Sequence, residues 1–159
     1  MTKPFDQAPP PSGGDAKHPA FKIVVIVEEN DIDALGHANN VAYLRWVQDI
    51  AVAHSDAVGL TFSRYGELGG VFVVRRHELD YLRPALRGEA LEVRTWIPTA
   101  MAAKCVRRTE IRRLHDLETL LQAETVWGFV DVARGRPTRI PDSVRQAFGM
   151  PPRTRSEPS

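Results

Sequence analysis

One long helical pattern, residues 40–58, stands among segments that otherwise resemble strands, and it limits the folds open to this chain. Its apolar positions form a wide arc made of Val41, Leu44, Val47, Ile50, Ala51 and Val58. The polar positions form one narrow face made of Arg45, Gln48, Asp49, Ser55 and Asp56. Gly59 follows directly, at the place where a glycine commonly ends a helix. A helix with such a wide apolar arc needs a large apolar cover, which a curved sheet would supply.

The segments around this helix predict that sheet. Residues 21–28 are short and β-branched, which is typical of a strand. Four more strand-like segments follow the helix, at 71–82, 89–97, 104–115 and 118–132. Residues 138–148 predict a short helix with Asp142 as the candidate N-cap. One strand, one buried helix and four further strands predict the α+β class, with an antiparallel five-stranded sheet around one long central helix.

Length and composition predict one domain with a tail at each end. A chain of 159 residues is large enough to bury one core. Residues 1–19 and 149–159 are poor in large apolar side chains, so we expect disordered tails around a domain at 20–148. The N-terminus lacks the apolar region of a secretory signal, and the one cysteine cannot form an internal disulfide. These features favour a cytoplasmic protein.

Charge and motifs argue against several functional classes. The net charge is +1, so no overall field demands a nucleic-acid or membrane partner. The arginines of 104–115 alternate with acidic and apolar residues, which predicts a solvated strand face. The phosphate-binding motifs GxGxxG and GxxxxGK[ST] are absent, as are GxSxG and HExxH. We therefore expect no cofactor and no metal. Cys105 lies in a strand pattern, which favours a packed core residue over a nucleophile.

The stretch DIDALGHANN, residues 31–40, leads into the start of the long helix. A helix start has unpaired backbone N–H groups and a partial positive charge, which can hold a developing oxyanion. Asp33 lies just before it, where a carboxylate could attack a carbonyl or activate a water. Gly36 would allow a tight turn and close approach to a ligand. The alternative is purely structural, because Asp and Asn are ordinary turn and N-cap residues.

The pattern Asp-x-Asp-x-x-Gly-His-x-Asn-Asn-x-x-Tyr, residues 31–43, resembles the signature of hotdog-fold acyl-CoA thioesterases of the 4-hydroxybenzoyl-CoA thioesterase-like group. Plant acyl-carrier-protein thioesterases have a related motif. The resemblance continues through residues 73–97 and 123–148, and so spans about 21–148. It implies the hotdog fold, an antiparallel sheet wrapped around one long helix, which agrees with the pattern of segments.

The resemblance also implies roles for individual residues. The position of Asp33 corresponds to the catalytic carboxylate, which works as nucleophile or general base. The backbone N–H at Asn40 would point at the thioester oxygen. His37 would be catalytic or orienting, or would make a structural hydrogen bond. Asn39 would bind substrate or fix the loop. Tyr43 is expected to be a packing residue.

Substrate and assembly follow from the same resemblance. Lys104 is the candidate contact for the phosphates of coenzyme A, with Arg107 or Arg108 as helpers. One lysine in that region leaves an acyl-carrier-protein substrate open. Glu78 corresponds to an often acidic position near the dimer interface, and we expect it to be structural. The group implies a homodimer or homotetramer. Three functions remain: an acyl-CoA thioesterase, a carrier-protein-dependent thioesterase, and a non-catalytic protein that binds acyl thioesters.

Overall fold

The computed structural model describes residues 19–151, which form one antiparallel sheet with three α-helices. The strands are β1 (Phe21–Ile26), β2 (Gly70–Tyr81), β3 (Ala90–Ala100), β4 (Lys104–Arg113), β5 (Thr119–Asp131) and β6 (Arg136–Pro137). The helices are α1 (Asn40–Ala57), α2 (Phe62–Leu68) and α3 (Asp142–Phe148), with a 3-10 turn, η1, at Glu29–Asp31. The predicted tails lie outside the described residues, apart from residue 19 and residues 149–151.

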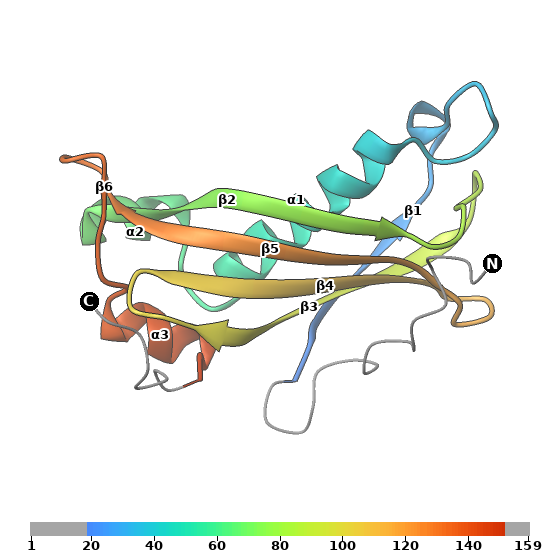
Figure 1. Cartoon of the computed structure of the whole chain (residues 1–159). Coiled ribbons are helices and arrows are strands. Elements are labelled where there is room, and N and C mark those ends of the chain that lie inside the picture. The colour runs from blue at the N-terminus through green and yellow to red at the C-terminus, as the bar shows by residue number, and fades with distance from the viewer. Residues whose placement is uncertain (1–18, 152–159) are drawn as a thin grey trace, which may run out of the picture.

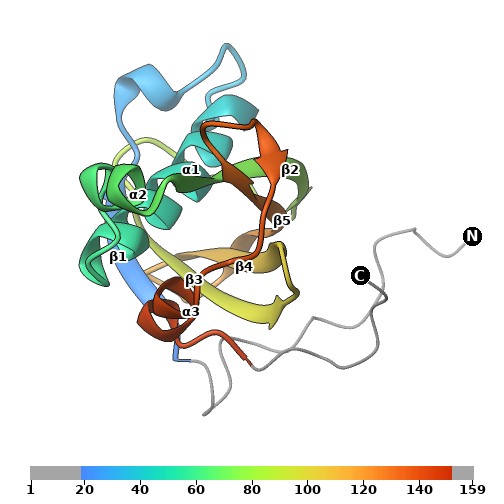
Figure 2. The same cartoon turned by 90° about the vertical axis from the view of Figure 1, so that its left-hand side faces the viewer.

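The sheet curves around α1. Its strand order is β1-β3-β4-β5-β2, and the short β6 pairs with β5 as a sixth strand. Every strand pairing is antiparallel. Figure 1 shows α1 lying along one face of the strands, and Figure 2, viewed from one end, shows the sheet bending around it. This arrangement confirms the predicted α+β architecture. Within residues 19–151, none of the helices is both long enough and apolar enough to cross a bilayer.

Apolar burial between α1 and the concave face of the sheet explains the curvature. The helix contributes Ala42, Tyr43, Trp46, Val47 and Ile50 to the main core. The sheet contributes Leu91, Val93, Ile111, Leu121 and Ala123. In β3, Leu91, Val93, Thr95 and Ile97 share one face and are all buried. Alternation along each strand therefore directs every second side chain toward the helix.

Two positions of the helix were assigned to the wrong face. Val41 is 73% exposed, although it was placed in the apolar arc. It lies about 180° around the helix from Ile50 and close to Arg45, because each residue advances about 100°. Ser55, which was placed on the polar face of the helix, is buried. Its hydroxyl donates to the carbonyl of Leu60 at 2.6 Å, which satisfies the buried group.

Three local features were not predicted. Helix α2 follows Thr61, whose Oγ1 accepts from the N–H of Arg64 at 3.2 Å. Strand β6 adds two residues to the predicted five strands. In α3 the predicted N-cap was one residue too late, because Pro141 is the N-cap and Asp142 is the first helical residue. A carboxylate in that first turn still interacts favourably with the helix dipole.

Candidate active site

The loop before α1 is closed by its own backbone. The N–H of Asp33 donates to the carbonyl of His37 at 2.9 Å, and the N–H of Gly36 donates to the carbonyl of Asp33 at 3.0 Å. Gly36 has φ +80°, a conformation that side-chain-bearing residues rarely adopt, so the glycine serves this tight turn. In Figure 1 the loop projects beyond the sheet, next to the first turn of α1.

Asp31 anchors the loop to the protein. Its carboxylate is buried, accepts from the N–H of Glu28 at 2.9 Å and forms an ion pair with Arg45 of α1. Its carbonyl accepts from the N–H of Asn39 at 2.7 Å. The hydrogen bond to this carboxylate raises the pKa of Arg45 above its usual value. The first carboxylate of the motif is therefore engaged in structure.

The start of α1 presents a free backbone donor. Asn39 is the N-cap, and its Oδ1 accepts from the N–H of Ala42 at 2.8 Å. Asn40 is the first helical residue, and its backbone N–H has no acceptor within residues 19–151. This donor also carries the partial positive charge of the helix end. It can therefore hold negative charge that develops on a ligand oxygen.

A cavity of about 250 Å³ opens at this helix end. Its lining consists of Asp33, Leu35, His37, Ala38, Asn40, Tyr43, Tyr81, Leu82, Arg83 and Pro84. The structure thus brings together Asp33, His37 and Asn40, the three residues predicted to be catalytic. Oδ1 of Asp33 accepts from the N–H of Leu35 at 2.8 Å, while Oδ2 has no partner within residues 19–151. The arrangement combines an exposed carboxylate with an oxyanion donor and an imidazole.

The end of β2 and residues 82–84 complete the cavity, and they were not predicted as site residues. The hydroxyl of Tyr81 donates to the carbonyl of Asn40 at 3.4 Å. The hydroxyl of Tyr43 accepts from the N–H of Ala85 at 2.9 Å, and burial raises the pKa of Tyr43. Arg83 adds a guanidinium that is 63% exposed and whose Nε lies 3.2 Å from Oε1 of Glu118. Tyr43 is 3% exposed in the main core, which confirms its predicted packing role.

The predicted substrate-binding residues do not all meet at this cavity. Gly36 and Asn39 shape the loop and the helix cap beside it. The Arg113 end of β4 lies near the cavity, because Nη2 of Arg113 donates to the carbonyl of Pro84, which lines it. Lys104 is at the opposite end of the same strand. Nine residues of strand correspond to about 30 Å. Within one subunit, Lys104 therefore does not reach the cavity.

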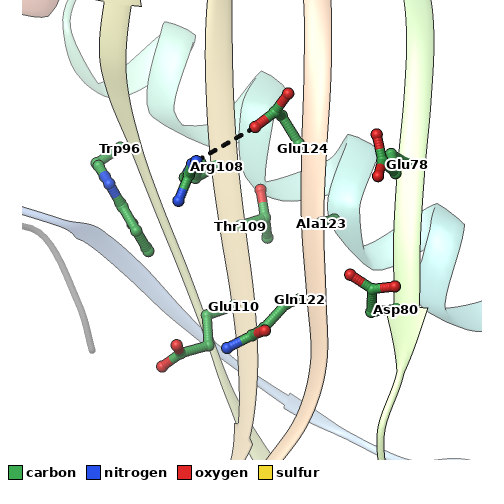
Figure 3. Close-up of a pocket in the computed structure, with 9 residues that line it drawn as sticks. All are labelled: Glu78, Asp80, Trp96, Arg108, Thr109, Glu110, Gln122, Ala123 and Glu124. Atoms are coloured by element: carbon green, nitrogen blue, oxygen red, sulfur yellow. Dashed lines mark hydrogen bonds and ion pairs between the residues drawn. The ribbon is translucent and has the colours of Figure 1, made fainter. Parts of the chain in front are cut away.

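A polar depression of about 160 Å³ lies on the other face of the sheet (Figure 3). In Figure 3 its side chains stand in front of the strands, with α1 behind them. Its charged groups are partly paired, since Arg108 lies 3.4 Å from Glu124, and Glu78 lies 3.4 Å from Arg76. Of the β4 arginines predicted to form a solvated face, Arg108 lines this depression, whereas Arg107 is buried on the opposite face of the sheet. The depression is separate from the candidate active site.

Family comparison agrees with the fold. A family described as the thioesterase-like superfamily matches residues 27–148. The chloroplastic acyl-acyl carrier protein thioesterase ATL2 of Arabidopsis thaliana is 26% identical over 128 residues, which are 80% of this chain and 68% of that protein. An acyl-[acyl-carrier-protein] hydrolase, FATB3 of Cuphea viscosissima, is 27% identical over 105 residues, which are 62% of this chain and 26% of that protein.

Solved structures have the same architecture. A 1,4-dihydroxy-2-naphthoyl-CoA thioesterase from Synechocystis superposes with a TM-score of 0.75 at 18% identity, covering 82% of this chain and 96% of its own. A Staphylococcus aureus protein in complex with CoA superposes with a TM-score of 0.79 at 15% identity, covering 91% and 94% of the two chains. With the family match over residues 27–148, the chain belongs to the thioesterase-like superfamily and is a hotdog-fold thioester hydrolase.

Proposed function

We propose that this thioester hydrolase cleaves acyl-CoA thioesters in the cavity at the start of α1, with Asp33 as its working carboxylate. The supporting observation is that Asp33, His37 and Asn40 all line one cavity of about 250 Å³. Thioester hydrolysis needs a nucleophile or base, a donor for the oxyanion and an accessible site. The thiolate is a good leaving group, so a strong acid is not required.

Asp33 can act in two ways. Its carboxylate can attack the thioester carbon and expel the thiolate, which leaves an acyl-aspartyl anhydride that water then hydrolyses. Alternatively it takes a proton from a water that attacks the same carbon. Oδ2 suits both roles, because Oδ1 already accepts from Leu35. In both routes negative charge develops on the thioester oxygen, where the backbone N–H of Asn40 stabilises it.

The neighbouring residues take supporting roles in this proposal. His37 orients the substrate or the attacking water from the cavity wall. Gly36 keeps the turn tight, and Asn39 caps the helix start by accepting a hydrogen bond from the N–H of Ala42. Arg83 offers an exposed guanidinium for a phosphate of coenzyme A. Lys104 enters the proposal only through a second subunit, because it lies far along β4 from the cavity in its own subunit.

A second candidate is hydrolysis of acyl groups carried by an acyl carrier protein. The relative from Arabidopsis thaliana supports it, because that protein is named an acyl-acyl carrier protein thioesterase and matches 80% of this chain. The reacting thioester is the same in both cases. The discriminating observation is whether turnover is much faster with the carrier-bound acyl group than with the same acyl-CoA.

We also propose a homodimer or a tetramer of dimers. The outer edges of β1 and β2 pair with no other strand within residues 19–151. Edge strands with free backbone groups favour pairing with another chain. Light scattering coupled to gel filtration measures the mass in solution, and a monomer would contradict this proposal.

The first experiment is thiol release from short, medium, long and aromatic acyl-CoAs. We expect turnover with at least one of them and a fall of at least about 100-fold in Asp33→Asn. The matched control is Glu29→Gln, which changes another exposed carboxylate just before the loop and should keep full activity. Turnover only with acyl carrier protein would favour the second candidate, and binding without turnover would indicate a non-catalytic protein. Full activity of Asp33→Asn would refute the assigned site.

A further inference from the structure

A second cavity, of about 320 Å³, lies at the other end of α1 from the loop 31–39. Asn40 and Ser55 are 15 residues apart on this helix, or about 22 Å along its axis at 1.5 Å per residue. In Figure 1, α2 and α3 lie at this end of the sheet, opposite the loop. Most lining residues are apolar: Ala51, Val52, Leu60, Phe62, Val71, Phe72, Ile97, Trp127 and Phe148. Within one subunit, the cavity is therefore separate from the candidate active site.

Arg107 of β4 lines this cavity as a buried cation without a counter-charge. It is 4% exposed, and no carboxylate oxygen lies within 4.0 Å of its guanidinium in residues 19–151. Asp56 also lines the cavity, but it is exposed and forms no ion pair with Arg107. Burial lowers the pKa of Arg107 to about 10, which leaves it charged at neutral pH. A buried, uncompensated charge is costly to the fold.

The known partners of Arg107 are neutral. Nη1 donates to Oγ1 of Thr95 at 3.1 Å and lies 3.0 Å from Nδ1 of His54. Burial lowers the pKa of His54 to about 4, so its neutral ring accepts this bond through Nδ1. The guanidinium also lies over the ring of Phe148, 5.6 Å from its centroid. None of these groups neutralises the positive charge.

The guanidinium keeps an unused donor on the side of the cavity. Nη2 has no acceptor within residues 19–151. Nε also lacks a partner, but it has less than 1 Å² of exposed surface, so Nη2 is the charged donor that a ligand oxygen can reach. Ser55 and Tyr65 line the same cavity, and their hydroxyl oxygens lie 2.8 Å apart. A ligand here would thus meet one unused charged donor in apolar surroundings.

We propose that this cavity binds a small apolar monocarboxylic acid, with its carboxylate on Nη2 of Arg107 and its tail against the apolar lining. The volume lies at the lower end of the range for small-molecule sites, which favours a medium-chain fatty acid or a single-ring aryl acid. Val52 and Phe62 are 59% and 91% exposed and line the cavity, so the entrance is itself apolar. A water would satisfy one N–H but would leave the charge uncompensated.

The proposal does not rest on thioester hydrolysis, and its test needs no turnover. The full chain is titrated by calorimetry with octanoate and, separately, with 1-octanol, which has the same tail without the charge. We expect octanoate to bind at least tenfold more tightly than octanol. The Asp33→Asn variant should bind octanoate like the natural protein, so failure of the proposed active site would leave this result unchanged.

Variants of Arg107 and its neighbours test whether Arg107 causes the preference for octanoate over octanol. Arg107→Met should lose the preference for octanoate, whereas the control Arg108→Met, which changes the next residue on the outer face of β4, should keep it. If Arg107→Met does not fold, Val52→Trp tests the proposal instead. The larger side chain at the exposed entrance should block the cavity and abolish octanoate binding, while Arg107 stays in place. Equal binding of octanoate and octanol, no octanoate binding, or an unchanged preference in Arg107→Met would overturn the proposal. An unchanged affinity in Val52→Trp would do the same.

Discussion

Asp31 and Asp33 are two residues apart in one loop, yet their carboxylates have opposite surroundings. Asp31 is 4% exposed and forms an ion pair with Arg45 of α1. Asp33 is exposed and lines the cavity at the helix start. Asp31 ends the 3-10 turn η1, where its ion pair holds it against α1, whereas Asp33 follows the extended Ile32 and belongs to the tight turn closed by the hydrogen bond from its N–H to the carbonyl of His37. One carboxylate therefore anchors the loop and leaves the other accessible.

Asp31→Asn should destabilise the protein by about 1–3 kcal/mol, because a buried charged acceptor is lost and Arg45 loses its partner. The free energy of unfolding in urea measures this loss. Asp33→Asn is the matched control, and its exposed side chain predicts a change of about 0.5 kcal/mol or less. Equal losses in the two variants would contradict the division of roles between these carboxylates.

Tyr43→Phe should cost about 1–3 kcal/mol of stability, because the buried N–H of Ala85 would lose its acceptor. Tyr81→Phe is the control. Its hydroxyl donates to the carbonyl of Asn40 at 3.4 Å, but the side chain is 46% exposed, so water can replace that donor. Urea denaturation of both variants compares the two hydroxyls directly. A larger loss in Tyr81→Phe would refute this account of the two hydroxyl groups.

Local patterns predicted the regular elements well. The long helix was expected at 40–58 and is found at Asn40–Ala57. Its start is marked by Asn39, whose side chain caps it, and Gly59 after its end has φ +85°. Helix α2 was missed because Phe62–Leu68 has seven residues, none of them buried. Phe62, Tyr65 and Leu68 recur at a spacing of three, but a pattern over two turns is too short to indicate a helix on its own.

Long-range features of the site were harder to predict. Tyr81 and Arg83 join the cavity from a segment about 40 residues beyond the loop, and no local pattern signals that contact. Arg107 was assigned to a solvated face with the other arginines of β4, whereas it points inward. The two faces of a strand alternate, so the side of each arginine depends on the register of β4 with β3, where Thr95 pairs with Thr109.

Cys105 should be nearly unreactive in the folded protein, because it packs in a second cluster of buried apolar residues with Ile97 and Phe129. It is 2% exposed, and burial raises the pKa of its thiol to about 11. Only the thiolate reacts with disulfide reagents, so both burial and the raised pKa slow the reaction. We expect labelling by a chromogenic disulfide at pH 8 to be at least about 100-fold slower in the native protein than in urea. Rapid labelling of the native protein would contradict the buried position.

His54 should make the protein less stable as the pH falls from about 6.5 to about 4. Burial, and then the nearby charge of Arg107, lowers the folded-state pKa of His54 to about 4, against an unfolded value of 6.5. Between these values the unfolded chain binds a proton that the folded chain does not, so lower pH favours unfolding. His54→Gln keeps an acceptor for Arg107 but cannot titrate. The urea midpoint of this variant should therefore fall less than that of the natural protein over the same pH range. His77 and the carboxylates are present in both proteins, so the part of the fall that they cause is the same. An identical pH dependence in the two proteins would show that His54 remains able to take up a proton in the folded state.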